Sequence, residues 1–181
     1  MAITPDSKNW TWVLERPCPD CGFDASSFPC NQVAGALREN AATWPALLSL
    51  PNVLLRPTEH RWSTLEYACH VRDVFRLFDK RLQLMLEHDD PLFENWDQDR
   101  TAIEDRYGEQ APEVVAAELL AAGAALAERF DAVPIASWSR NGRRTDGAVF
   151  TVDSFSRYLL HDPVHHLHDV EAGLAELAGS E

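Results

Sequence analysis

The spacing of hydrophobic residues predicts four helices in this chain. In the segment 31–50, apolar side chains recur at steps of three and four, which is the period of one helix face. A stronger stripe of the same period follows Ser63-Thr64-Leu65-Glu66, a capping box that starts a helix reaching to about Glu87. Two further helices are expected, from Pro112 to Phe130 and from Asp153 to Leu177.

The segments between these helices differ in character. Residues 1–30 are interrupted by several prolines and are expected to form an irregular arm. Residues 88–110 are a long polar connection with a helical turn expected at 100–106, and connections of this length often shape a functional opening. Asn141-Gly142 predicts a small hairpin over 138–149, just before the last helix. We therefore expect an all-α protein with one domain over 1–181, in which the arm precedes a four-helix bundle over 31–181.

Composition agrees with one globular domain and argues against some partners. The chain has 181 residues, enough for one well-buried core but short for two. Its 16 Lys+Arg against 29 Asp+Glu give a formal net charge of −13. Binding to nucleic acid depends on Lys and Arg displacing counterions, so a nucleic-acid partner is not expected. No apolar run is long enough to cross a bilayer and no secretory signal is visible, so we expect a cytoplasmic protein without a membrane partner.

Histidines are concentrated in the last predicted helix. His161 and His165 are four residues apart and therefore lie one above the other on a helix, where two neutral imidazoles can bind a divalent transition metal. A third ligand must come from another helix, and His70 beside the apolar stripe of the second helix is the best candidate. The alternative for His70 is a hydrogen-bonded core histidine, which is the more common role of a lone histidine on an apolar face.

Pro163 lies inside this histidine segment and allows two interpretations. It removes a helical hydrogen bond and crowds the carbonyl of Leu159, so it can form a local kink that tilts His161 toward a metal. Alternatively, the helix ends here and restarts with Asp162 as a new cap, which would change the geometry of the His161–His165 pair.

Two segments resemble a known family. Trp62–Asp73 (WSTLEYACHVRD) and Tyr158–His166 (YLLHDPVHH) are similar to the DinB-like superfamily, most closely to actinobacterial DinB proteins related to the N-terminal domain of mycothiol-dependent maleylpyruvate isomerase. The resemblance implies an up-down-down-up four-helix bundle that holds a divalent metal through one histidine of the second helix and an HxxxH pair of the last. Here these ligands would be His70, His161 and His165, with His165 and His168 as a competing pair.

The resemblance also implies a chemistry. Characterised relatives are thiol-dependent transferases or isomerases that use mycothiol, bacillithiol or glutathione, and many members have no known activity. Three protein ligands leave an open metal position at which a thiol loses its proton. We expect zinc, or else nickel or iron, and transfer of a low-molecular-weight thiol to a small electrophile. A metal-dependent hydrolase and a non-catalytic stress-response module that binds metal are the alternatives, and a homodimer is compatible with each.

Several other residues are candidates near the metal or for a second site. Polar side chains close to the ligands can orient the imidazoles, although helix solvation is the alternative: Glu66, Asp162, His168 and Asp169. The turn Cys18-Pro19-Asp20-Cys21-Gly22 resembles half of a zinc-ribbon site. Cys18, Cys21 and Cys30, completed by a histidine or aspartate, are therefore a possible second metal site, or else thiols that tether the arm. Cys69 is expected in the core.

Overall fold

The computed structural model describes residues 10–179, so the first nine residues of the predicted arm and the last two of the chain lie outside the described part. The long helices are α1 (Val33–Leu48), α2 (Thr64–Glu87), α4 (Pro112–Asp131) and α5 (Val152–Ala178). The shorter elements are α3 (Gln98–Glu104), η1 (Trp10–Leu14), η2 (Cys30–Gln32), η3 (Tyr107–Glu109), η4 (Ile135–Ser137), β1 (Leu92–Phe93), β2 (Asn141–Arg144) and β3 (Val149–Thr151). No helix within 10–179 is both long and apolar enough to cross a bilayer.

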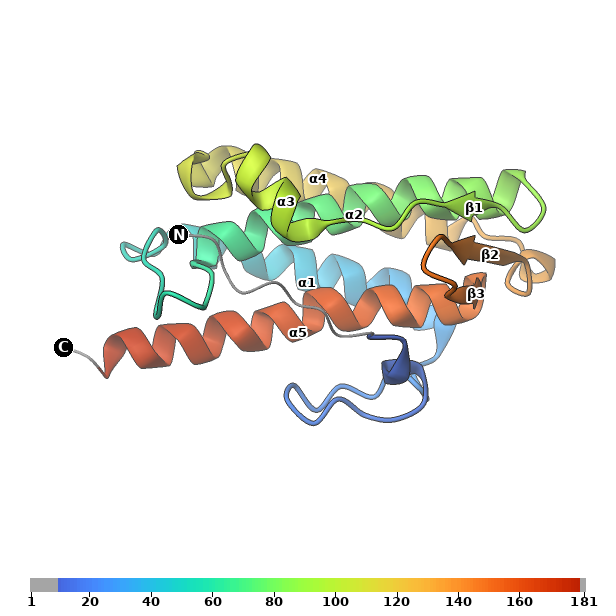
Figure 1. Cartoon of the computed structure of the whole chain (residues 1–181), viewed down its shortest axis with the longest axis horizontal. Helices are drawn as coiled ribbons and strands as arrows, with labels where there is room; N and C mark the ends of the chain where they lie inside the picture. The colour runs from blue at the N-terminus through green and yellow to red at the C-terminus, as the bar shows by residue number, and fades with distance from the viewer. Residues whose placement is uncertain (1–9, 180–181) are drawn as a thin grey trace.

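The long helices form a bundle whose order in space differs from their order along the chain. In Figure 1, α1 and α5 run in one direction, and α2 and α4 run in the opposite direction. α4 packs against α1 and α2, and α5 closes the bundle against the same two helices. Because α2 and α4 are parallel, the segment that joins them must return along the bundle, which explains its length. The predicted up-down-down-up four-helix bundle is confirmed.

The sequence signals at the starts of α2 and α4 are confirmed. Ser63 Oγ accepts a hydrogen bond from Glu66 N at 3.2 Å, and Glu66 Oε2 accepts one from Ser63 N at 2.9 Å. The capping box is therefore formed, and it fixes the first turn of α2 next to His70. α4 begins at Pro112, as expected of a residue that lacks a backbone N–H.

α5 begins slightly earlier than predicted and is unbroken. Its N-cap is Thr151 rather than Asp153, because the Thr151 hydroxyl accepts a hydrogen bond from Ser154 N. The helix continues through Pro163 to Ala178, so the interpretation in which it restarts at Asp162 is wrong. Buried Asn40 of α1 donates a 2.8 Å hydrogen bond to the Pro163 carbonyl. This contact fixes α5 against α1 at the level of the histidines.

A hairpin is present before α5 and belongs to a three-stranded sheet, but Asn141-Gly142 does not form its turn. These two residues lie in β2, and the chain turns at Asp146-Gly147, where Gly147 has a φ of +95°. β2 and β3 are antiparallel, and β1 joins β2 in parallel from the connection between α2 and α4. β1 was not predicted, because a strand of two residues shows no alternation of polar and apolar positions. Phe150 of β3 packs against Phe155, which also contacts Phe78, with ring centroids 5.9 and 4.8 Å apart. The sheet therefore closes the end of the bundle where α2 ends and α5 begins (Figure 1).

Two helical glycines provide a matched test of how closely α1 and α4 pack. A Cβ on Gly123 of α4 would lie 2.8 Å from Ala41 Cβ and 3.2 Å from a ring carbon of Phe75, whereas a Cβ on Gly35 of α1 meets nothing within 4 Å. Ala41 Cβ is attached to the α1 backbone and cannot move alone. We therefore expect Gly123→Ala to destabilise the protein by about 1–3 kcal/mol, despite the better helix propensity of alanine.

Gly35→Ala is the control for this substitution, and it should stabilise the protein by up to about 1 kcal/mol. Urea unfolding of the two variants measures both effects. A gain in stability from Gly123→Ala would contradict the close approach of α1 and α4.

Candidate metal centre

The histidines expected to share one metal are divided between two groups of ligand atoms. In residues 10–179, the first group is His70, Asp162 and His166, here called the α2–α5 group. The second, called the arm–α5 group, is Cys18, Cys21, His161 and His165. Within each group the ligand atoms lie within 4.8 Å of one another. The set His70, His161 and His165 stays a prediction, since the structure places His70 in one group and the other two in the second.

The division follows from the rotation of side chains around α5. Residues four apart lie on one face of a helix, so positions 161 and 165 form one stripe and positions 162 and 166 form the next. One residue step turns the helix by about 100°. The first stripe therefore faces the cysteines of the arm, while the second faces His70 on α2.

The α2–α5 group has the spacing of a metal site. His70 Nε2 lies 3.4 Å from Asp162 Oδ1, and His166 Nε2 lies 3.7 Å from the same oxygen. Tetrahedral zinc, with Zn–N and Zn–O bonds of about 2.0–2.2 Å, places its nitrogen and oxygen ligands about 3.4 Å apart. The observed separations equal or slightly exceed this value, so the three residues can hold a divalent cation after small adjustments.

Buried polar atoms without partners support this fit. His70 is fully buried, and neither of its ring nitrogens has a hydrogen-bond partner among the described residues. Asp162 Oδ1 is also buried and makes no hydrogen bond within the described part of the chain. Leaving such a group unpaired costs about 1–3 kcal/mol, and coordination to a metal would remove that cost. Two imidazoles and one carboxylate suit zinc, nickel or iron.

The protonation states of these residues also favour a metal. Burial lowers the pKa of His70 below its ordinary value, so its imidazole is neutral at pH 7. Burial acts to raise the pKa of Asp162, but the neighbouring His166 and His70 outweigh it and lower that pKa to about 2. Metal ligation requires neutral imidazoles and ionised carboxylates, and His70 and Asp162 meet this requirement.

Asp169 lies where it can orient His166. Asp169 Oδ2 lies 3.0 Å from His166 Nδ1, which leaves Nε2 of the same ring facing Asp162. A carboxylate on the far side of a ligating imidazole fixes the ring and raises its basicity. The same oxygen lies 3.7 Å from His165 Nε2, so Asp169 stands between the two groups.

The remaining predicted residues lie elsewhere. The Glu66 carboxylate pairs with Arg56 and caps α2. His168 is exposed and belongs to neither group. Cys30 is also outside both groups, and burial together with nearby Asp153 raises its pKa. Cys69 is buried in the core, as expected.

His166 was missed as a ligand candidate. The signal was present in the sequence, because Asp162 and His166 have the same four-residue spacing as His161 and His165. Both pairs lie on one helix, so spacing alone does not say which of them faces His70.

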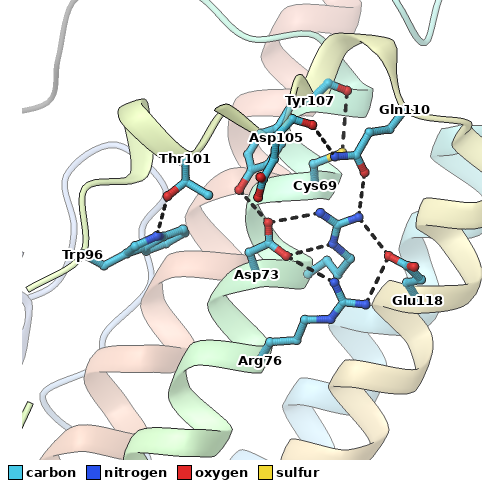
Figure 2. Close-up of polar contacts among 10 residues, drawn as sticks. Cys69, Asp73, Arg76, Trp96, Thr101, Asp105, Tyr107, Gln110 and Glu118 are labelled. Atoms are coloured by element: carbon cyan, nitrogen blue, oxygen red, sulfur yellow. Dashed lines mark hydrogen bonds and ion pairs between the residues drawn. The ribbon is translucent and has the colours of Figure 1, made fainter. Parts of the chain in front are cut away.

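The connection between α2 and α4 covers His70 with an indole. The rings of Trp96 and His70 are stacked, with centroids 5.3 Å apart and an interplanar angle of 10°. Trp96 Nε1 donates a 2.8 Å hydrogen bond to Thr101 Oγ1, which holds the indole in place (Figure 2). Farther along, the Tyr107 hydroxyl donates to Asp73 Oδ2 at 2.7 Å, so the connection is fastened to α2 beyond His70 (Figure 2).

A cavity of about 430 Å³ lies near this group, although none of the three ligand residues lines it. Trp62 lines the cavity and also packs against the His70 ring, with centroids 5.4 Å apart. Side chains of both charges line it, among them Arg56, Glu66 and Arg106. The volume is that of a small-molecule site. The side chains of Asp162 and His166 are 31% and 16% exposed, whereas the ligand atoms of His70 and Asp162 Oδ1 are buried.

Comparison with known proteins supports the fold. No protein-family model matches the chain, and no curated protein matches its sequence. Among solved structures, the chain is similar to YfiT from Bacillus subtilis, with a TM-score of 0.64 and 15% sequence identity over 98% of this chain and 94% of that one. YfiT is described as a probable metal-dependent hydrolase with an unusual four-helix bundle topology. At this identity the likeness shows a shared fold, and the expected four-helix bundle is confirmed.

Proposed function

We propose that this chain is a metal-dependent enzyme that holds a divalent cation, expected to be zinc, through the α2–α5 group. The observation that carries the proposal is the fully buried His70, whose unpaired ring lies 3.4 Å from a carboxylate of α5. The description of YfiT as a probable metal-dependent hydrolase, on the same fold, supports it.

The number of protein ligands favours catalysis over a purely structural role. Catalytic zinc sites keep three protein ligands and one open position, whereas structural sites are closed by four. A cation held by this group would lower the pKa of a thiol or water molecule and so supply a nucleophile at neutral pH.

The chain's own residues supply orientation and shielding. Asp169 holds the His166 ring with Nε2 toward Asp162. Trp96 and Trp62 both pack against His70 and exclude water from its ring. Arg56 and Glu66 place paired charges in the wall of the neighbouring cavity, where they can bind the polar groups of a substrate.

Within this class, we favour transfer of a low-molecular-weight thiol of the mycothiol type to a small electrophile. A cavity lined by charges of both signs suits a polar thiol that carries carboxylate and amide groups. Hydrolysis of a small molecule is the second candidate, and the description of YfiT is the observation that favours it.

Cobalt substitution tests the proposal. A thiolate bound to Co²⁺ gives a charge-transfer band in the near ultraviolet. The variant in which Cys18 and Cys21 are both serine removes the thiols of the arm–α5 group, so a band that appears only when a thiol is added is assigned to that thiol. We expect N-acetylcysteine to produce this band in the cobalt-loaded variant, and His70→Ala in the same background to abolish it.

N-acetylserine is the matched control, because it differs only in the reacting atom and should give no band. Cobalt binding without a thiol band would favour the hydrolase. A failure of the double variant to bind cobalt at all would contradict the metal centre itself.

A further inference from the structure

The arm presents two thiols from one tight turn. Cys18 N donates a 2.9 Å hydrogen bond to Phe23 O, and Gly22 N donates one of the same length to Cys18 O. Gly22 has a φ of +73°, in the left-handed region that glycine adopts without strain. This backbone turns the Cys18 and Cys21 sulfurs toward the same point, where both belong to the arm–α5 group.

α5 presents two imidazoles to that point. His161 and His165 are one helical turn apart, with ring centroids 5.1 Å apart. His165 Nδ1 lies 3.6 Å from Cys18 Sγ. In tetrahedral zinc, with Zn–S of about 2.3 Å and Zn–N of about 2.0–2.1 Å, sulfur and nitrogen ligands lie about 3.6 Å apart. The observed separation is within hydrogen-bond reach of a sulfur atom, and it also equals that of two ligands of one zinc ion.

Burial makes this cluster costly without a cation. Cys18 and His161 are 1% and 4% exposed, and His161 Nε2 has no hydrogen-bond partner among residues 10–179. Trp10 packs on both histidines, with its ring centroid 5.4 Å from His161 and 5.3 Å from His165. Buried polar groups need partners. The two negative charges of the thiolates would also balance the two positive charges of a zinc ion, so the whole buried site would be neutral.

We infer that the arm–α5 group is a second metal site, a structural zinc site that fastens the arm to α5. Four protein ligands complete a tetrahedral shell and leave no position for substrate, in contrast to the α2–α5 group. Zinc binding would thus contribute directly to the folding of the arm, whose η1 and η2 pack on α5. The site is independent of the proposed function, because the two groups share no ligand.

Cobalt spectra and zinc content test this site. In the metal-free wild-type chain, added Co²⁺ should produce a thiolate charge-transfer band and the strong visible bands of tetrahedral cobalt. The thiolate band should be strongly reduced in Cys21→Ser and His165→Ala, but unchanged in Cys30→Ser, the matched control for a partly exposed thiol outside the group. Visible bands from cobalt in the α2–α5 group should persist in all three variants. Zinc content should fall from about two equivalents to about one in Cys21→Ser.

Alkylation of the wild-type chain gives a second measurement that needs no variant. Cys21 should resist iodoacetamide in the zinc-loaded protein and react after a chelator is added. A wild-type protein without a thiolate band, equal reactivity of Cys21 with and without zinc, or a Cys18–Cys21 disulfide in the zinc-treated reduced protein would each overturn the inference. Because the α2–α5 group contains no cysteine, loss of the band would leave the proposed metal centre untouched.

Discussion

His166→Ala is expected to weaken cation binding at the α2–α5 group by more than about 100-fold, and to abolish metal-dependent activity. Loss of a residue that only orients a ligand costs about 10–100-fold in affinity, so loss of the ligand itself must cost more. The substitution leaves His70 and Asp162 as a two-ligand site. Competition with a chromophoric chelator measures the affinity in the variant with serine at positions 18 and 21, in which the arm–α5 group has lost both of its thiol ligands.

His168→Ala is the matched control for this experiment. His168 lies in the same helix segment, is exposed and belongs to neither group, so its removal should leave the affinity unchanged. Equal affinities in His166→Ala and His168→Ala would contradict the proposed ligand set. The same assay on His161→Ala tests the set predicted from the sequence, because a loss of affinity there would place His161 at the catalytic cation.

Asp73→Ala is expected to destabilise the fold by about 2–4 kcal/mol. Arg72 is buried, and its guanidinium donates to Asp73 at 2.9 and 3.1 Å. The Tyr107 hydroxyl donates to the same carboxylate (Figure 2). Removing one partner of a buried ion pair costs about 3–5 kcal/mol because the other charge is left without compensation. Arg72 would keep Glu118 and Gln110 as acceptors, which places the expected loss below the top of that range.

Asp79→Ala provides the comparison on the same helix. Asp79 also pairs with an arginine, Arg129, through two contacts, but the two side chains are 21% and 33% exposed. This partly buried pair is more accessible to solvent than Arg72–Asp73, and solvent weakens an ion pair toward the roughly 0–1 kcal/mol of exposed pairs, so this variant should lose about 1 kcal/mol in urea unfolding. Equal stabilities of Asp73→Ala and Asp79→Ala would contradict the role given to Asp73, because the hydrogen bonds around Asp73 would then not hold the α2–α4 connection against α2.

The Asp73 variant should also show where the connection is held. Tyr107 and Gln110 both bond to the Arg72–Asp73 pair, so its loss should release the segment that carries Trp96. We expect faster hydrogen exchange at the backbone amides of 96–110 in Asp73→Ala than in Asp79→Ala. Because Trp96 stacks on His70, the same variant should weaken cation binding more than Asp79→Ala does.

The sequence by itself determined the features that depend on neighbours within a few residues. The capping box at Ser63, the start of α4 at Pro112 and the periodic apolar faces all follow from contacts inside one or two helical turns. The bundle class follows from the number of helices and from the one long connection. The candidate metal-binding residues were also visible, because histidines and cysteines at fixed spacings stand out from the composition.

Only the tertiary structure decided which of these residues lie together. His161 and His165 are one residue step from Asp162 and His166, and a rotation of about 100° around the axis of α5 separates the two pairs. That rotation is fixed by packing between distant segments, including the hydrogen bond from Asn40 to the Pro163 carbonyl. The arm then covers one stripe of α5 and α2 covers the next, so one histidine cluster is divided between two ligand groups. Sequence spacing determines which side chains lie on one face of a helix, but it does not determine which other segment packs against that face.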